Sequence, residues 1–127
     1  MAIKVILDTN FLLLPFQHKL DFEMEVEQLL EEPHDFVVLG QCVDELKEMS
    51  ARHRRFSPAS RAALAFIAKR GFVIERGFFG SPDNALLEYC KAKNAILCTL
   101  DVALRRRAKN FGVRVIFLRD KGHLALA

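Results

Sequence analysis

Short apolar runs alternate with helix-period patterns along the chain. The run from Ile3 to Leu7 is rich in Ile and Val and predicts a strand. Apolar residues then recur at the spacing of an amphipathic helix, at Phe22, Val26, Leu29 and Leu30. Pro33 should stop that helix. Phe36 to Leu39 predicts a second strand, and a helix starting near Val43 follows it.

The second half of the chain repeats the same alternation. Ser57-Pro58 predicts an N-cap and first turn, for a helix that ends at Gly71. Ser81-Pro82 predicts the start of another helix in the same way. The remaining strands are expected at Phe72 to Ile74, Ala95 to Leu100 and Val113 to Leu118, with a short basic helix before the last. Regular alternation of strands and helices predicts one α/β domain over residues 1–127, with a parallel sheet covered by helices on both faces.

The composition fits a packed globular domain. The chain has 127 residues, of which 51% are hydrophobic, including eleven Phe. Its longest apolar run, Phe11 to Phe16, is far below the roughly 20 residues of a membrane span. The N-terminus lacks the layout of a signal peptide, because Lys4 interrupts the first apolar run and Asp8 ends it. We therefore expect a cytoplasmic protein without a membrane partner.

Cysteine and histidine offer no clear metal or disulfide pattern. Cys42, Cys90 and Cys98 form no CxxC pair, and each stands among apolar residues, which favours buried reduced thiols. The four histidines have no ligand spacing, so zinc is not expected; they are His18, His34, His53 and His123.

Charge is strongly segregated along the chain. Residues 1–50 hold eleven acids and three Lys, a net charge of −8, whereas residues 51–127 hold sixteen Lys and Arg and five acids, a net charge of +11. A solvated surface explains any single basic cluster, but this separation suits a polyanionic partner. We expect the RNA-binding residues to be Arg52, Arg54, Arg55, Arg105, Arg106 and Arg107.

Four acids stand where a ligand site is expected. In open α/β sheets, ligands bind beyond the carboxyl ends of the strands. Asp8 follows the first strand and Asp101 the fourth, while Glu45 and Asp83 lie early in the helices after the second and third strands. Each acid has an ordinary alternative, because Asp8 and Asp101 could cap helices and Asp83 could favour a helix dipole. Glu45 could also be one more surface acid.

Several carboxylates in one cleft repel one another, and a bound cation reverses that cost. An oxygen-only ligand set favours Mg²⁺ or Mn²⁺, with one or two ions. Such an ion can activate a water and neutralise charge on a phosphodiester. Thr9, Asn10 and Thr99 could orient the ligands as a second layer of hydrogen-bonding groups.

These residues resemble the PIN-domain family over nearly the whole chain. The matching segments are Ile6-Leu7-Asp8-Thr9-Asn10, Val43 to Leu46, Ser81 to Leu86 and Thr99 to Leu104. The last segment, with its basic tail, looks most like the PIN nucleases of small-subunit ribosomal RNA processing and their archaeal relatives. The resemblance implies that Asp8, Glu45, Asp83 and Asp101 are the catalytic and metal-binding residues of a ribonuclease. It also implies a PIN-like, Rossmann-like open sheet of five strands in the order 3-2-1-4-5.

One position departs from many relatives, which carry a further acid two residues after the fourth acid. Here that position is Ala103, so the metal site has one carboxylate fewer than in those relatives. A toxin ribonuclease with an antitoxin, or a non-cleaving PIN domain that binds RNA or protein, are the alternatives within the fold. A homodimer or a ribosome-assembly partner is also possible.

Two other classes of protein fit less well. A response-regulator receiver needs its phosphoacceptor after the third strand, where this chain has Glu75 and Arg76. A phosphatase with a DxD nucleophile needs an acid at position 10, which is Asn10. Phe78 and Phe79, between glycines, form either an exposed pair that packs on another protomer or a base, or a loop packed on the core.

Overall fold

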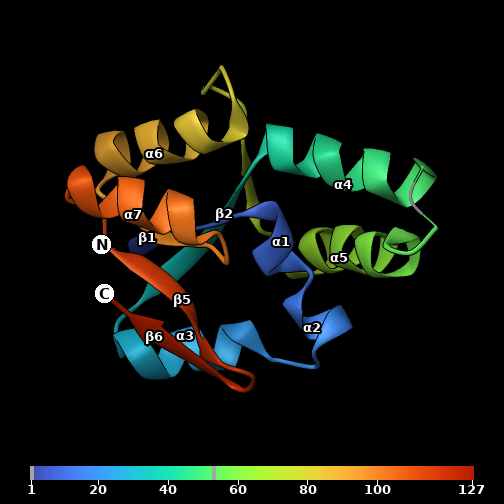
Figure 1. Cartoon of the computed structure of the whole chain (residues 1–127), viewed down its shortest axis with the longest axis horizontal. Coiled ribbons are helices and arrows are strands. Elements are labelled where there is room, and N and C mark those ends of the chain that lie inside the picture. The colour runs from blue at the N-terminus through green and yellow to red at the C-terminus, as the bar shows by residue number, and fades with distance from the viewer. Residues whose placement is uncertain (1, 53) are drawn as a thin grey trace.

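The computed structural model describes residues 2–52 and 54–127. Figure 1 shows the arrangement of the chain, with its helices packed around a twisted sheet. The elements, in chain order, are β1 (Ile3–Leu7), α1 (Thr9–Leu12), α2 (Leu14–Gln17), α3 (Phe22–Leu30), β2 (His34–Leu39), α4 (Gly40–Arg52), α5 (Ser57–Arg70), β3 (Val73–Glu75), α6 (Pro82–Lys93), β4 (Ile96–Cys98), α7 (Val102–Asn110), β5 (Val115–Asp120) and β6 (His123–Leu126).

The sheet has the strand order β3-β2-β1-β4-β5-β6, which confirms the expected order of the first five strands. These five pair in parallel, and β1 is central, with Ile6 opposite Val37 of β2 and Leu97 of β4. The sixth strand, β6, was not predicted and pairs antiparallel to β5. Its register includes Asp120 opposite His123, so a short turn through Gly122 returns the chain along the sheet edge.

Helices cover both faces of the sheet, as expected. Val5, Ile6 and Leu7 are all fully buried, although successive residues of a strand point to opposite faces. In Figure 1, α6 and α7 lie on one side of the central strands and α3 lies on the other. Helix α1 starts at the carboxyl end of β1, and α7 starts at the carboxyl end of β4.

The predicted ends of the helices hold at three positions and fail at two. Ser81 caps α6, with its hydroxyl accepting a bond from the Asn84 N–H, and α5 ends at Gly71 with φ +65°. The prediction that Ser57 caps α5 is wrong. Phe56 occupies the N-cap position, because the Ser57 hydroxyl donates instead to the Ser50 carbonyl at 2.7 Å.

Helix α3 ends at Leu30, where Glu31 adopts a left-handed conformation with φ 52°, in agreement with the expectation that it stops by Pro33. Helix α4 starts at Gly40, immediately after β2, rather than near Val43. Two short helices, α1 and α2, also fill the segment between Asp8 and His18, where only an apolar run was noted.

The three cysteines are free and buried, as expected from their apolar neighbours. Burial raises the pKa of Cys42 to about 11 and that of Cys90 to about 12, which keeps both thiols protonated and unreactive. Within the described part of the chain, no helix is long and apolar enough to cross a membrane.

Candidate active site

The site lies where β1 and β4 end side by side. Leu7, the last residue of β1, pairs with Cys98, the last residue of β4. Asp8 directly follows β1, and its N–H donates to the Cys98 carbonyl at 3.0 Å. Asp101 begins the next helix after β4. The sheet thus brings together the two acids that are 93 positions apart in the sequence, at the carboxyl edge where ligands bind in open α/β sheets.

Asp8 is half-buried and held at both carboxylate oxygens. Oδ1 accepts a bond of 2.7 Å from the Thr9 N–H, which caps α1, and Oδ2 accepts one of 2.8 Å from the Thr99 hydroxyl. Burial raises the pKa of Asp8 above its ordinary value, and the two hydrogen bonds oppose that change. The negative charges of Asp83 and Glu45 raise the pKa further. Asp8 therefore sits in a site with surplus negative charge.

Glu45 and Asp83 approach Asp8 from two different helices. Glu45 lies in the second turn of α4, and its Oε2 accepts a 2.9 Å bond from the Thr9 hydroxyl. Asp83 is half-buried in the first turn of α6. Both acids are close enough for their charges to act on Asp8. Three of the four predicted acids thus form one electrostatically linked group.

Asp101 joins this group through Thr99. Its Oδ1 accepts bonds from the N–H groups of Ala103 and Leu104, at 2.8 and 3.1 Å, so it caps α7. Its own N–H donates to the Thr99 hydroxyl oxygen at 3.1 Å. The capping roles considered for Asp8 and Asp101 are therefore real, and they fix both side chains at the edge of the sheet.

The carboxylates lie along the same edge of the sheet but do not converge on one point. Among residues 2–52 and 54–127, no group of three or more His, Cys, Asp or Glu is close enough to hold a metal ion. The donor chemistry nevertheless suits a hard cation, because the four predicted side chains offer only carboxylate oxygens. The raised pKa of Asp8 also reflects repulsion that a cation would relieve.

The hydrogen-bonding residues predicted around the acids fall into two groups. Thr9 and Thr99 are buried, with 3% and 1% of their surface exposed, and each hydroxyl contacts an acid. Asn10 is exposed on α1, and its backbone carbonyl accepts a bond from the Leu13 N–H. The two threonines are therefore the residues placed to orient the carboxylates.

The predicted basic residues lie on both sides of the acids. Arg107 of α7 donates to the side-chain oxygen of Asn84, which is the neighbour of Asp83 on α6. Arg105 turns towards β5, with its guanidinium carbon 4.2 Å from the centre of the Phe117 ring. Arg106 is exposed on the same helix.

The other basic cluster follows the far end of α4, about 10 Å along the helix from Glu45. There, Arg52 pairs with Glu48 at 3.3 Å, Arg55 lies over Phe56, and Arg54 is exposed. His53, the remaining member of the sequence cluster, lies outside the described residues.

Arg76 is a further cation at this edge that the sequence pattern did not single out. It follows β3 and pairs with Asp44 of α4 at 3.6 Å. Its guanidinium lies against Gly40, where an added Cβ would stand 2.5 Å from Arg76 Nη1. A glycine directly after a strand was the one sequence feature that could have indicated so close an approach.

The two phenylalanines of the loop before α6 have different environments. The Phe78 ring packs on Tyr89, with the ring centres 5.2 Å apart, and its carbonyl accepts a bond from Gln41. Phe79 is 77% exposed. Each of the two expectations therefore holds for one ring: Phe78 packs on the core, and Phe79 is exposed to solvent.

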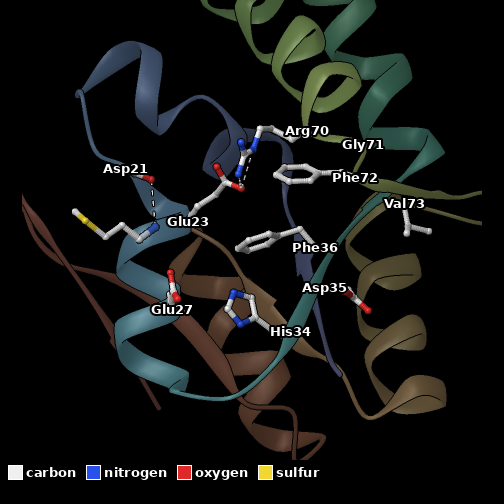
Figure 2. A pocket seen from close by; sticks show the side chains of 11 residues that line it. Asp21, Glu23, Glu27, His34, Asp35, Phe36, Arg70, Gly71, Phe72 and Val73 are labelled. Carbon is white, nitrogen blue, oxygen red and sulfur yellow. Dashed lines mark hydrogen bonds and ion pairs between the residues drawn. The ribbon is translucent and has the colours of Figure 1, made fainter. Parts of the chain in front are cut away.

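A cavity of about 490 Å³ lies away from the acids, at the amino-terminal end of β2. Figure 2 shows it between the acidic side chains of α3 and the first residues of β2, with Arg70 paired to Glu23 at 3.1 Å. Its lining includes His34 and Asp35, which begin β2, whereas the candidate active site follows the other end of the strands. None of the four predicted acids lines it.

The fold agrees with comparisons of the chain with known proteins. A family model described as a PIN like domain matches residues 5–121. The chain belongs to this PIN-like family. This finding confirms the resemblance on which the site residues were assigned.

Individual relatives resemble the chain over nearly its whole length. Ribonuclease VapC4 of Methanocaldococcus jannaschii is 26% identical over 125 residues, which cover 97% of this chain and 95% of that protein. The structure of the PIN domain endonuclease Utp24 matches with a TM-score of 0.80 and 17% identity, over 97% of this chain and 90% of that one. A domain of a functionally unknown protein from M. jannaschii matches with a TM-score of 0.67 and 19% identity, over 94% and 93% of the two chains.

Proposed function

We propose that this chain is a metal-dependent ribonuclease that hydrolyses phosphodiester bonds within RNA. The observation that carries the proposal is the state of Asp8, which is half-buried at the end of β1 under the charges of Asp83 and Glu45. Membership of the PIN-like family supports it, as does similarity to a protein named a ribonuclease. The segregated positive charge of residues 51–127 suits an RNA substrate.

The residues that would hold Mg²⁺ or Mn²⁺ are Asp8, Glu45, Asp83 and Asp101. When bound, one or two such ions supply an activated water and neutralise charge developing on the phosphate. Ala103 provides no additional carboxylate beside Asp101, so the proposal requires only one tightly held ion.

The contributions of the chain itself are orientation and charge. Thr99 and Thr9 hold the carboxylates of Asp8 and Glu45 in place by hydrogen bonds of 2.8 and 2.9 Å. Asp83 lies in the first turn of α6 and Asp101 caps α7, so the positive ends of both helix dipoles favour a phosphate there. Two cations lie next to neighbours of the acids, because Arg107 donates to Asn84, which follows Asp83, and Arg76 pairs with Asp44, which precedes Glu45. Bound RNA would thus be held with one phosphate at the carboxylates.

Two biological settings fit the chain. Processing of ribosomal RNA is the setting we propose first, because the segment from Thr99 to Leu104 and its three arginines resembles those nucleases. A toxin ribonuclease paired with an antitoxin is the second, and it needs the same cutting activity that the name of Ribonuclease VapC4, a relative matched over 97% of the chain, describes. We propose a cytoplasmic location for both settings. The partner would be a ribosome-assembly protein in ribosomal RNA processing, and an antitoxin or a second protomer for a toxin.

The deciding experiment is incubation of the purified protein with structured RNA, with Mn²⁺ and with EDTA. We expect cleavage only with the metal, and none with Asp8→Asn. Asp44→Asn is the matched control, because Asp44 is an exposed acid beside Glu45 that pairs with Arg76. Equal cutting by Asp8→Asn, or undiminished cutting in EDTA, would refute the proposal. Retained RNA binding without any cutting by the intact protein would favour the non-cleaving alternative.

A further inference from the structure

A second hollow on the protein lies along α7, beyond the acidic site. It has a volume of about 500 Å³, within the usual range for small-ligand sites. Its floor is apolar, formed by Val113, Val115 and Phe117 at the start of β5, and Ala127 pairs with Val115 along one wall. Val113 and Val115 are only 9% and 2% exposed. The floor therefore belongs to the edge of the core.

The rim of this hollow is cationic. Four basic residues line it, namely Arg105, Arg106, Lys109 and Arg114. In the part of the chain that the structure describes, none of the four has an ion-pair partner. Unpaired cations around an apolar floor would attract a flat apolar group that carries a phosphate, which describes a nucleotide unit.

Arg105 provides a surface on which a base can stack. Its guanidinium carbon lies 4.2 Å from the centre of the Phe117 ring, the shortest of the three cation–ring contacts found among the described residues. Contact with the Phe117 ring on one side of the planar guanidinium holds Arg105 against the floor of the hollow. Single-stranded RNA bases stack on arginine planes as well as on aromatic rings.

Helix α7 links the hollow to the acidic site, because Asp101 caps its start and the hollow is lined by residues further along it. Asp101 caps α7, and Arg105 follows it by four residues, or about 6 Å along the helix. Val102, Arg105, Arg106 and Lys109 have the spacing of one helix face, and that face connects the acidic edge to the hollow. A strand held at Asp101 could therefore continue along α7.

We propose that this hollow binds one unstacked base of single-stranded RNA, on the same strand that the acidic site holds. The inference rests on the proposed ribonuclease function and adds to it a base-binding hollow outside the acidic site. Arg105 stacks on the base, while Arg106, Lys109 and Arg114 contact the adjoining phosphates.

The test compares two probes of equal charge in EDTA, where cutting is not expected. One is fluorescein-labelled oligouridylate, and the other is an abasic oligomer with the same number of phosphates. Fluorescence anisotropy should show tighter binding of oligouridylate to the wild-type protein, by roughly 5- to 150-fold for one stacked base.

Arg105→Lys keeps the charge and removes the planar surface. We expect it to abolish most of the preference for oligouridylate while leaving affinity for the abasic oligomer nearly unchanged. Arg119→Lys is the matched control, because Arg119 lies on β5 as Phe117 does but pairs with Asp120 at 3.6 Å, and the base preference of this variant should match that of the wild type. Phe117→Leu, which removes the ring beneath Arg105, should reduce the preference in the same direction, with thermal melting used to verify folding.

The outcomes separate this inference from the ribonuclease proposal. A base preference that survives in Arg105→Lys, or its absence from the wild type, would overturn the base-binding hollow even if the protein cuts RNA with Mn²⁺. An absent preference would also be the result if the hollow receives an acidic segment of a protein instead. Loss of the preference in Arg105→Lys supports the hollow whether or not cutting is observed.

Discussion

The hydroxyl of Thr99 donates a hydrogen bond of 2.8 Å to Asp8 Oδ2, across 91 positions of the sequence. The same hydroxyl oxygen accepts the N–H of Asp101 at 3.1 Å. One buried side chain at the end of β4 therefore joins two of the four candidate ligands. Thr99 fixes the separation of Asp8 and Asp101 without itself being a ligand.

Removing this hydroxyl should weaken the site more than the fold. Thr99→Val keeps the shape and loses both hydrogen bonds, which should cost about 1–3 kcal/mol in the free energy of unfolding. Metal affinity or the cleavage rate should fall by roughly 10- to 100-fold, as for other residues that orient metal ligands. Thr99→Ser keeps the hydroxyl and should retain most of the rate. Equal rates for Thr99→Val and the wild type would show that the contact has no role in cutting.

Metal binding should stabilise the folded protein. At about 100 times the dissociation constant, Mg²⁺ or Mn²⁺ should add about 2.7 kcal/mol and raise the melting temperature by several degrees. Asp8→Asn and Asp101→Asn should each abolish the shift, whereas Asp44→Asn should keep it. A shift that persists in both of the first two variants would refute the assignment of the site.

Without metal, the charge on Asp8 should destabilise the fold. Its pKa is raised chiefly by burial, with contributions from Asp83 and Glu45. Because the folded-state pKa exceeds the unfolded one, the stability linked to Asp8 is greatest below the unfolded value of about 3.9 and decreases as pH rises through the folded pKa. Asp8→Asn should therefore raise the denaturant midpoint at neutral pH in EDTA. Urea titrations at several pH values will show whether this gain disappears in acid, as it should.

Much of the fold could be predicted because local patterns agree with the final packing. The apolar runs at Ile3 to Leu7 and Val113 to Leu118, and the cap at Ser81, reflect interactions of each segment with nearby residues or with a buried sheet. The strand β6 escaped prediction because its pattern is short and its partner is the preceding strand. Ser57 was misassigned because its hydroxyl donates to a longer-range partner, the Ser50 carbonyl of α4, across the turn between α4 and α5.

The site could be predicted in part for a similar reason. Positions after strands meet at one edge of a parallel sheet, so the placement of Asp8 and Asp101 follows from chain order. The approach of Arg76 to Gly40 and the stacking of Arg105 on Phe117 depend on side-chain packing between distant elements. No local spacing in the sequence encodes either contact.

RNA binding should depend on salt through the arginines of α7. Replacing Arg105 and Arg106 by Gln should weaken RNA affinity and lower the slope of log affinity against log salt by roughly 0.7 to 0.9 for each lost phosphate contact. Arg70→Gln serves as the control, because Arg70 pairs with Glu23 beside the cavity of Figure 2 and should leave the slope unchanged. An unaltered slope in the Arg105 and Arg106 variant would assign those residues to solubility alone.

The ends of the RNA products should identify the mechanism. Attack by water in line with the sugar 3′ oxygen leaves a 5′-phosphate and a 3′-hydroxyl, whereas attack by the RNA's own 2′-hydroxyl leaves a cyclic phosphate. The second route needs a general base such as histidine. His123 is the first residue of β6, with its Nδ1 2.8 Å from Asp120, and His53 lies outside the described residues.

We therefore expect 5′-phosphate and 3′-hydroxyl ends, detected by enzymatic end-labelling of the products. Asp8→Asn and Asp83→Asn should each lose most of the cleavage rate yet keep RNA affinity, because these acids would hold the ion while the arginines hold the RNA. His123→Ala should cut at the wild-type rate. Cyclic phosphate products that are lost in His123→Ala would contradict hydrolysis. They would indicate attack by the 2′-oxygen, at a catalytic centre away from the carboxyl edge of the sheet.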